Sequence, residues 1–162
     1  GGPRIKGKKM REKRQHFVTE LVWSRKGLSV EPRGHDMMSG SIVYPPHDPA
    51  NDVAVLFTET SGCLPMCEHG TIGTITIAIE ERLIVPKIPG IVRMETPDGL
   101  VITNSRMEDG KDKSERLTNV SSFLAAENIE VDCPDIGISK ADVYYGGNFY
   151  AIIDRKENFK GL

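Results

Sequence analysis

Cysteine and long apolar runs are both scarce in this sequence of 162 residues. Its three cysteines are few and odd in number, which argues against a disulfide framework, so we expect a reducing, cytoplasmic location. No apolar run approaches the length that spans a bilayer, and no apolar segment follows the basic start as it would in a signal peptide. The sequence therefore predicts neither a membrane protein nor a disulfide-stabilised one.

An excess of charge of one sign is also missing. The net charge is −2, which gives no general attraction to nucleic acid or to anionic membranes, so we expect neither as a partner. The locally basic segment 6–17 is interpreted as a solvated helix. With 38% hydrophobic and 27% charged residues, the composition is typical of a folded protein, and we expect a single domain over residues 1–162.

Most of the chain has the pattern of β-strands. Runs of β-branched and aromatic residues are bounded by Pro, Gly, Asn and Asp, which favour turns. The glycine pair 146–147 lies within the last run and indicates a bulge or a close backbone approach, and residues 107–115 are expected to form a polar loop. The predicted strand segments are 39–46, 52–59, two strands within 90–105, 116–120, 128–135 and two strands within 141–154.

One segment, residues 69–86, has the pattern of a helix. Ile72, Ile75, Ile79 and Leu83 follow a helical spacing, and the following proline ends the segment. The segment is apolar on nearly all sides, so we expect it to be buried. A buried helix among strands predicts an α+β fold, in which a curved, mostly antiparallel sheet or barrel surrounds one central helix.

The stretch SGCLPMCEH, residues 61–69, holds two cysteines and a histidine, and four interpretations stay open. Cys63 and Cys67 have three residues between them, unlike a C-x-x-C redox pair. With His69 they offer three metal ligands, although the spacing is not a standard zinc pattern. Cys67 also directly precedes the predicted helix, where free N–H groups lower a thiol pKa. The fourth interpretation is an inert, buried cysteine.

If Cys67 is reactive, the residues after it suit an anionic substrate. His69 and Gly70 are polar or small, so a substrate carboxylate can approach the N–H groups at the helix start. A thiolate beside a bound carboxylate is placed to remove a proton from the adjacent carbon.

Three motifs give the sequence a specific resemblance. MCEHGTIG (66–73), EPRGHDMMSGSIVYPP (31–46) and YGGNFYAIID (145–154) resemble, in order and spacing, hallmark motifs of the proline racemase family. Within that family, GHDMMSGS and ETSGCLPMC are similar nearly letter for letter to the bacterial 4-hydroxyproline 2-epimerases. The resemblance covers essentially the whole chain.

The resemblance implies a two-domain enzyme built like diaminopimelate epimerase, of which this chain is the N-terminal half. Each half provides one cysteine at a helix start; one removes the Cα proton and the other protonates the opposite face, with no metal or other cofactor. Cys67 corresponds to the first cysteine, His69 to a pocket histidine, Leu64 to an apolar contact, and Ser39 to a small residue that leaves room for a 4-hydroxyl group. Cys63 and Cys133 match no catalytic position and are expected in the core.

The implied function is the interconversion of trans-4-hydroxy-L-proline and cis-4-hydroxy-D-proline. The alternatives are a proline racemase or a trans-3-hydroxy-L-proline dehydratase of the same family, and a non-catalytic remnant or binding module. A homodimer is a possible assembly implied by the family.

Two departures from the family pattern bear on activity. The second half, with its own cysteine, is absent from these 162 residues, so we expect no epimerase activity from this chain alone. Glu68 stands where the family has glycine. Its bulk and charge are expected to weaken binding of the substrate carboxylate and to raise the pKa of Cys67. The alternative is that Glu68 points away from the site, favoured by the dipole of the first helical turn.

Overall fold

The computed structural model describes residues 4–134 and 137–153. The chain divides into two compact units at residue 120. The single domain expected over residues 1–162 stays a prediction. In the described residues, no helix combines the length and the apolar character needed to cross a membrane.

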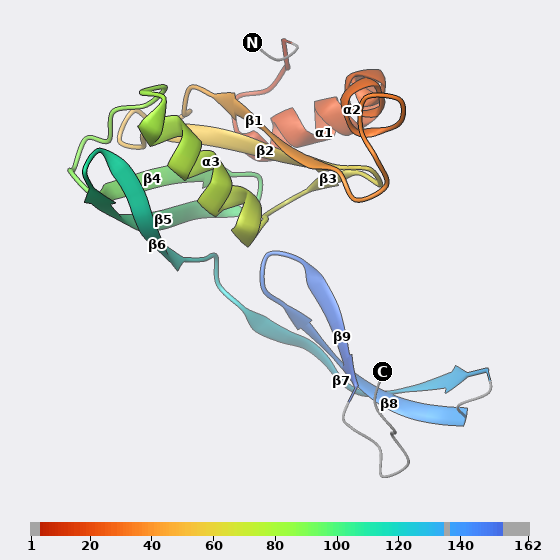
Figure 1. The fold of residues 1–162 in the computed structure, drawn as a ribbon. Helices are drawn as coiled ribbons and strands as arrows, with labels where there is room; N and C mark the ends of the chain where they lie inside the picture. Colours follow the sequence, from red (N-terminus) through yellow and green to blue (C-terminus); the bar gives the residue numbers. More distant parts are fainter. Residues whose placement is uncertain (1–3, 135–136, 154–162) are drawn as a thin grey trace. The chain divides into compact units, whose positions relative to one another are not determined.

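The first unit is a curled, mixed sheet with helices on both faces (Figure 1). Its strands run in the order β1-β2-β4-β5-β6, with β3 paired to β2, and every pair is antiparallel except β2 with β4. The predicted α+β class with a mostly antiparallel, curved sheet is confirmed. The elements are α1 (Met10–Glu20), α2 (Val22–Ser29), β1 (Ser39–Tyr44), β2 (Val53–Glu59), β3 (Cys63–Leu64), α3 (Glu68–Glu80), β4 (Ile91–Thr96), β5 (Gly99–Glu108) and β6 (Lys111–Thr118).

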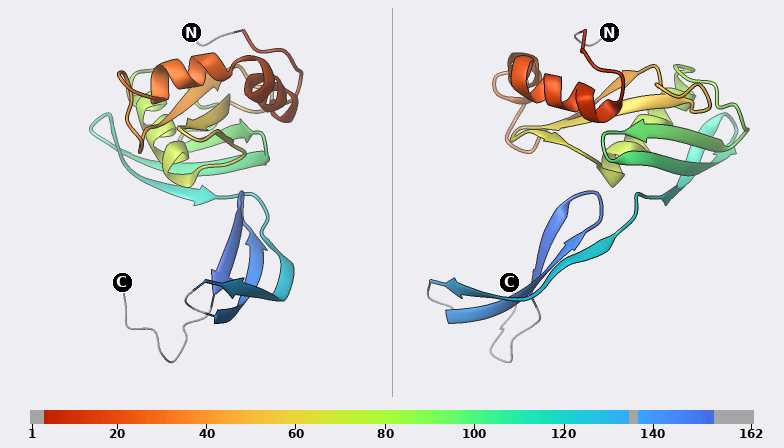
Figure 2. Two further views of the ribbon diagram at one scale, coloured as in Figure 1. Left: turned by 90° about the vertical axis from the view of Figure 1, so that its right-hand side faces the viewer. Right: turned by 180° about the vertical axis from the view of Figure 1, so that it is seen from behind.

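Strand β2 is buried on both faces and organises two hydrophobic clusters. Because side chains alternate along a strand, Val53, Val55 and Phe57 pack on the α3 side, together with residues of β4 and β5. Ala54 and Leu56 pack on the opposite side, against α1. Figures 1 and 2 show α3 over one face of the sheet and α1 and α2 over the other.

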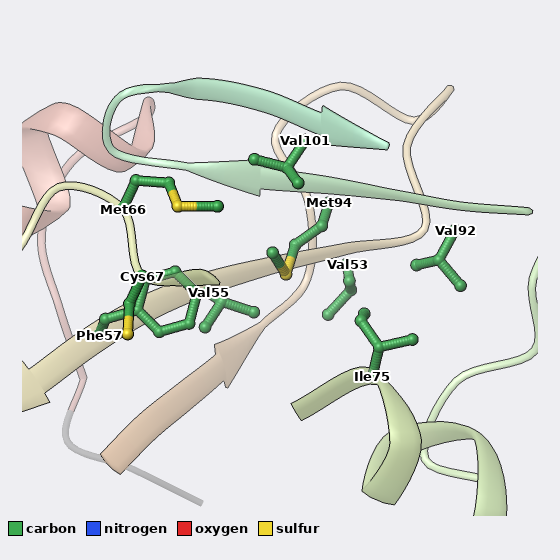
Figure 3. Packing of buried hydrophobic residues seen from close by; sticks show 9 residues of the cluster. All are labelled: Val53, Val55, Phe57, Met66, Cys67, Ile75, Val92, Met94 and Val101. Carbon is green, nitrogen blue, oxygen red and sulfur yellow. The ribbon is translucent and has the colours of Figure 1, made fainter. Parts of the chain in front are cut away.

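Helix α3 confirms the predicted helix, but the prediction that it is buried all round is wrong. Ile75 is fully buried against the sheet (Figure 3), whereas Ile72 and Ile77 are 43% and 59% exposed. The helix ends at Glu80, and Arg82 has a φ of 55°. The reason is geometric: the sheet curls around one side of α3 only, so apolar residues on the outer side stay uncovered in the described structure.

Threonines take part of the buried face that the periodicity assigned to isoleucines. Thr71 and Thr74 are both buried. Their hydroxyls donate to the carbonyls of Cys67 and Gly70, at 2.8 and 2.6 Å. Because these back-bonds satisfy the polar groups inside the helix, threonine can face the sheet without leaving a buried hydroxyl unpaired.

The predicted polar loop over residues 107–115 is wrong, because strands β5 and β6 extend through it as a hairpin. Its turn lies at Asp109 and Gly110, whose φ angles are 52° and 76°. The register shifts after Arg106, which marks a bulge. The residues of this hairpin are mostly exposed, so their polarity reflects solvent contact and not the absence of strands.

The second unit is a three-stranded antiparallel sheet of β7 (Phe123–Cys133), β8 (Gly137–Tyr145) and β9 (Phe149–Ile153). The Gly146–Gly147 pair lies in the turn between β8 and β9, which confirms the two strands predicted within 141–154, whereas the suggested bulge is wrong. Tyr145 contacts the rings of Phe123 and Phe149 at centroid distances of 5.1 and 4.7 Å. Cys133, expected in a core, is half-buried. The ends of the predicted strands at 135 and 154 lie outside the described residues.

A carboxyl pair joins the β5–β6 hairpin to α3. Asp112 accepts a hydrogen bond from Thr76 of α3 at 3.1 Å, and Glu115 accepts one from Ser105. Burial raises the pKa of Glu115 to about 7, with Asp112 adding to the rise and the Ser105 hydroxyl opposing it. The folded hairpin therefore holds Glu115 in its protonated form well above the ordinary range of a glutamate.

This arrangement predicts a loss of stability on raising the pH. Since the folded pKa lies above the unfolded one, the folded state binds more protons, and its free energy of unfolding falls between about pH 4.5 and pH 7. Glu115→Gln, which is neutral throughout, should be as stable as the wild type near pH 4.5 and more stable at pH 8. Urea unfolding midpoints at both pH values check this. Glu20→Gln, on the exposed part of α1, is the control, and equal pH dependence in all three proteins would contradict the assignment.

Candidate functional site

Cys67 occupies the N-cap of α3, as the sequence predicted. Its backbone is extended, with φ −149° and ψ 113°, and the helix proper begins at Glu68. An acidic residue in a first helical turn is favoured by the positive end of the helix dipole, so Glu68 helps start the helix here. The thiol is 8% exposed and lies beside the Phe57 ring in the α3-side cluster (Figure 3).

The first turn of α3 surrounds the thiol with polar groups. The Sγ atom of Cys67 lies 3.5 Å from Nε2 and 3.6 Å from Nδ1 of His69. The backbone N–H of Gly70 donates to the same sulfur. The first N–H groups of an α-helix have no intrahelical partner, so this turn also presents donors to an anion.

A pocket of about 260 Å³ opens in front of this helix start. Five residues singled out in the sequence line it together: Ser39, Leu64, Cys67, His69 and Gly70. They come from β1, β3 and the beginning of α3, so the tertiary fold brings them together from separate parts of the chain.

Glu68, the remaining residue singled out, is not among those that line this pocket. It is exposed, and its Oε1 accepts a hydrogen bond from the side-chain amide of Asn119 at 2.9 Å. This geometry agrees with the alternative in which Glu68 points away from the anion site. Its bulk therefore does not fill the space in front of the helix start.

Among the pocket residues that sequence reasoning missed, Glu59 is the charged one. It follows the buried run of β2, and its position opposite Ser39 comes from the pairing of β1 with β2. The sequence signal for it was an acidic residue that continues the alternation of Val55 and Phe57 towards the same face. That alternation identifies Glu59 as a pocket residue only when the strand partner is known.

The pKa of Cys67 is raised, contrary to the lowering expected from a helix start alone. Burial is the largest cause, and the charges of Glu59 and Glu68 add to it. The N–H of Gly70 opposes the rise. In this chain the desolvation of the sulfur outweighs the helix N-terminus, so Cys67 is held as a thiol.

Cys63 does not belong to this site. It packs in the cluster on the α1 side of β2 and is buried, as expected for a core cysteine. Burial raises its pKa to about 11 despite the nearby Arg14, whose Nε donates to the Cys63 carbonyl at 2.8 Å. Cys63 and Cys67 therefore pack in different clusters, on opposite sides of β2. Over residues 4–134 and 137–153, no cluster of His, Cys, Asp and Glu side chains is arranged to hold a metal ion.

The family described as proline racemase matches residues 1–162. The chain belongs to the proline racemase family. It is 62% identical over 160 residues to a 4-hydroxyproline 2-epimerase of Spirosoma linguale, which covers 99% of this chain and 48% of that protein. It is 59% identical over 162 residues to a 4-hydroxyproline epimerase of Brucella ovis, covering 100% of this chain and 49% of that protein.

A solved epimerase structure shares the fold. It is a hydroxyproline epimerase from Agrobacterium vitis with bound trans-4-hydroxy-L-proline, and it matches with a TM-score of 0.88 at 28% identity. The match covers 95% of this chain and 46% of that one. The chain thus spans about half the length of the curated relatives it matches.

Gly70 is predicted to be necessary for the packing of the Cys67 side chain. A Cβ atom at position 70 would lie 3.0 Å from the Phe57 ring and 3.1 Å from the Cys67 sulfur, whereas one at Gly73 meets nothing within 4 Å. Gly73→Ala should gain about 1 kcal/mol from helix propensity. Gly70→Ala should be less stable than Gly73→Ala by about 1–3 kcal/mol, because the added methyl group overpacks the site. Urea unfolding of the two variants measures the difference in their free energies of unfolding. Equal stabilities would contradict a steric conflict at position 70.

The charge of Glu68 is predicted to act on Cys67 through space. Glu68→Gln removes one of the charges that raise the pKa of Cys67, so the pH at which alkylation by iodoacetamide accelerates should move down. The measurement uses a Cys133→Ser background to remove that half-buried thiol. Glu81→Gln, at the far end of α3, is the matched control. An unchanged profile for Glu68→Gln, or an equal change for Glu81→Gln, would refute the through-space effect.

Proposed function

We propose that this chain supplies one half of the active site of an amino-acid epimerase that interconverts trans-4-hydroxy-L-proline and cis-4-hydroxy-D-proline. The observation that carries the proposal is the placement of the Cys67 thiol at the start of α3, beside His69 and at the wall of a pocket. The 62% identity to a 4-hydroxyproline 2-epimerase supports the choice of substrate.

In the proposed reaction, the first-turn N–H groups of α3 hold the substrate carboxylate and stabilise the charge that develops on it when Cα loses its proton. Cys67 acts as thiolate and takes that proton, forming an S–H bond as the Cα–H bond breaks. A second thiol returns a proton to the opposite face. Two groups are needed because inversion requires an acceptor and a donor on opposite sides of Cα.

The raised pKa of Cys67 fits a site that is completed by its substrate. Burial and two carboxylates favour the thiol in the chain described here. The ammonium group of a bound amino acid brings a positive charge next to the sulfur, which favours the thiolate. His69, 3.5 Å from the sulfur, is placed to accept the thiol proton.

We assign the second thiol to the part of the relatives' length that this chain does not span, so the proposed active site lies between two halves. The exposed Ile72 and Ile77 support this arrangement, because they leave apolar surface on the outer side of α3 next to the pocket. A cytoplasmic location and a homodimer are part of the same proposal. Ser39 is assigned to the space for the 4-hydroxyl group, and Leu64 to an apolar contact with the ring.

The test is exchange of the substrate Cα hydrogen in deuterated water, followed by NMR with trans-4-hydroxy-L-proline. It uses the complete polypeptide that contains these residues. The wild type should exchange, and Cys67→Ser should lose activity by about 10²–10⁴-fold, because the acceptor of the Cα proton is removed. Cys133→Ser, which changes a thiol in the second unit, is the matched control.

Three further outcomes separate the alternatives. Exchange that survives in Cys67→Ser would overturn the role of this thiol. An absence of Cα-hydrogen exchange in the wild type would favour another substrate or a non-catalytic binding module. Turnover by the 162-residue chain alone would contradict the need for a second half.

The exchange rate of Glu68→Gly, compared with that of the wild type, reports whether glutamate is tolerated at that position.

A further inference from the structure

A carboxylate that the reaction does not use lines the same pocket as Cys67. Glu59 ends strand β2, where its Cα partner across the sheet is Ser39 of β1. Directly paired residues of neighbouring antiparallel strands project from the same face. Phe57, two residues earlier, packs on the α3 side beside Cys67, so the alternation along β2 directs Glu59 to that side as well.

The structure holds this carboxylate in place. Ser61 donates a hydrogen bond to Glu59 Oε1 at 2.6 Å, and the Arg25 guanidinium donates to the Glu59 backbone carbonyl at 3.0 Å. The other carboxylate oxygen, Oε2, accepts no hydrogen bond from the described residues. A fixed carboxylate with one free oxygen is an acceptor prepared for a donor that comes from a ligand.

The two sides of the pocket attract different groups of the substrate. The N–H groups of α3 attract the substrate carboxylate, and that carboxylate would be repelled by Glu59. Glu59 is the acidic residue among those that line the pocket, and its charge reaches the Cys67 sulfur. A hydroxyl group on the substrate ring can donate a hydrogen bond to Glu59, beside the small Ser39.

We infer that Glu59 determines specificity for a hydroxylated substrate, with its carboxylate accepting a hydrogen bond from the ring hydroxyl opposite Ser39. The inference rests on the proposed function and names the residue that distinguishes hydroxyproline from proline. A pocket that contains an acceptor for a hydroxyl rejects the analogue without it, because the acceptor loses water and gains no partner.

The experiment compares kcat/KM of the complete polypeptide for trans-4-hydroxy-L-proline and for L-proline. Glu59→Gln should reduce the preference for the hydroxylated substrate by about ten-fold or more, since a charge-assisted hydrogen bond is replaced by a neutral one. Glu59→Ala is the second variant, in which no side-chain acceptor remains. Both variants are first checked for wild-type unfolding midpoints in urea.

Glu68→Gln is the matched control. Both glutamates raise the pKa of Cys67, but Glu59 alone of the two lines the pocket. An electrostatic effect on the thiol should therefore appear in both variants, as a change in the pH profile with both substrates. A changed substrate preference should appear only in the Glu59 variants.

Each outcome decides between named possibilities. An equal loss for both substrates in Glu59→Gln would assign Glu59 to the ring ammonium that they share, and would overturn hydroxyl recognition. An unchanged preference in an active enzyme would overturn the inference alone. If the wild type has no activity with either substrate, the proposed function is overturned, and the inference with it.

Discussion

The packing of one face of α3 against strand β2 is the contact on which the candidate site depends. Phe57 and Ile75 are both buried in the same cluster, and Cys67 joins it at the point where the helix begins. Gly70 permits the close approach, because no side chain separates its backbone from the Phe57 ring and the sulfur. Since the helix cannot slide without opening this cluster, the thiol and the first-turn N–H groups have one fixed position relative to the pocket.

Two opposed effects set the electrostatics of Cys67. The first turn of α3 brings the N–H of Gly70 to the sulfur, which favours the thiolate, whereas packing against the sheet removes water from the sulfur, which favours the thiol. Desolvation is the larger effect here, and Glu59 and Glu68 add to it.

Local patterns along the chain were sufficient for several elements. The run after Cys67 predicted a helix, and the runs at 52–59 and 90–105 predicted strands that the structure contains. The hairpin at 107–115 was missed because exposed strands carry polar residues, and periodicity identifies a strand by its buried face. The burial of α3 was overestimated because Ile72 and Ile77 are apolar yet face away from the sheet.

By itself, the sequence determined the local features of the candidate site: a cysteine at a helix start, followed by a histidine and glycine, within motifs specific to the proline racemase family. These features depend on residues adjacent in the chain, whose geometry follows from helix formation. The tertiary structure alone decided that Ser39 and Glu59 face each other, that Glu68 bonds to Asn119, and that the thiol is desolvated. Those properties arise from strand register and burial, which join segments that are distant along the chain and leave no local pattern.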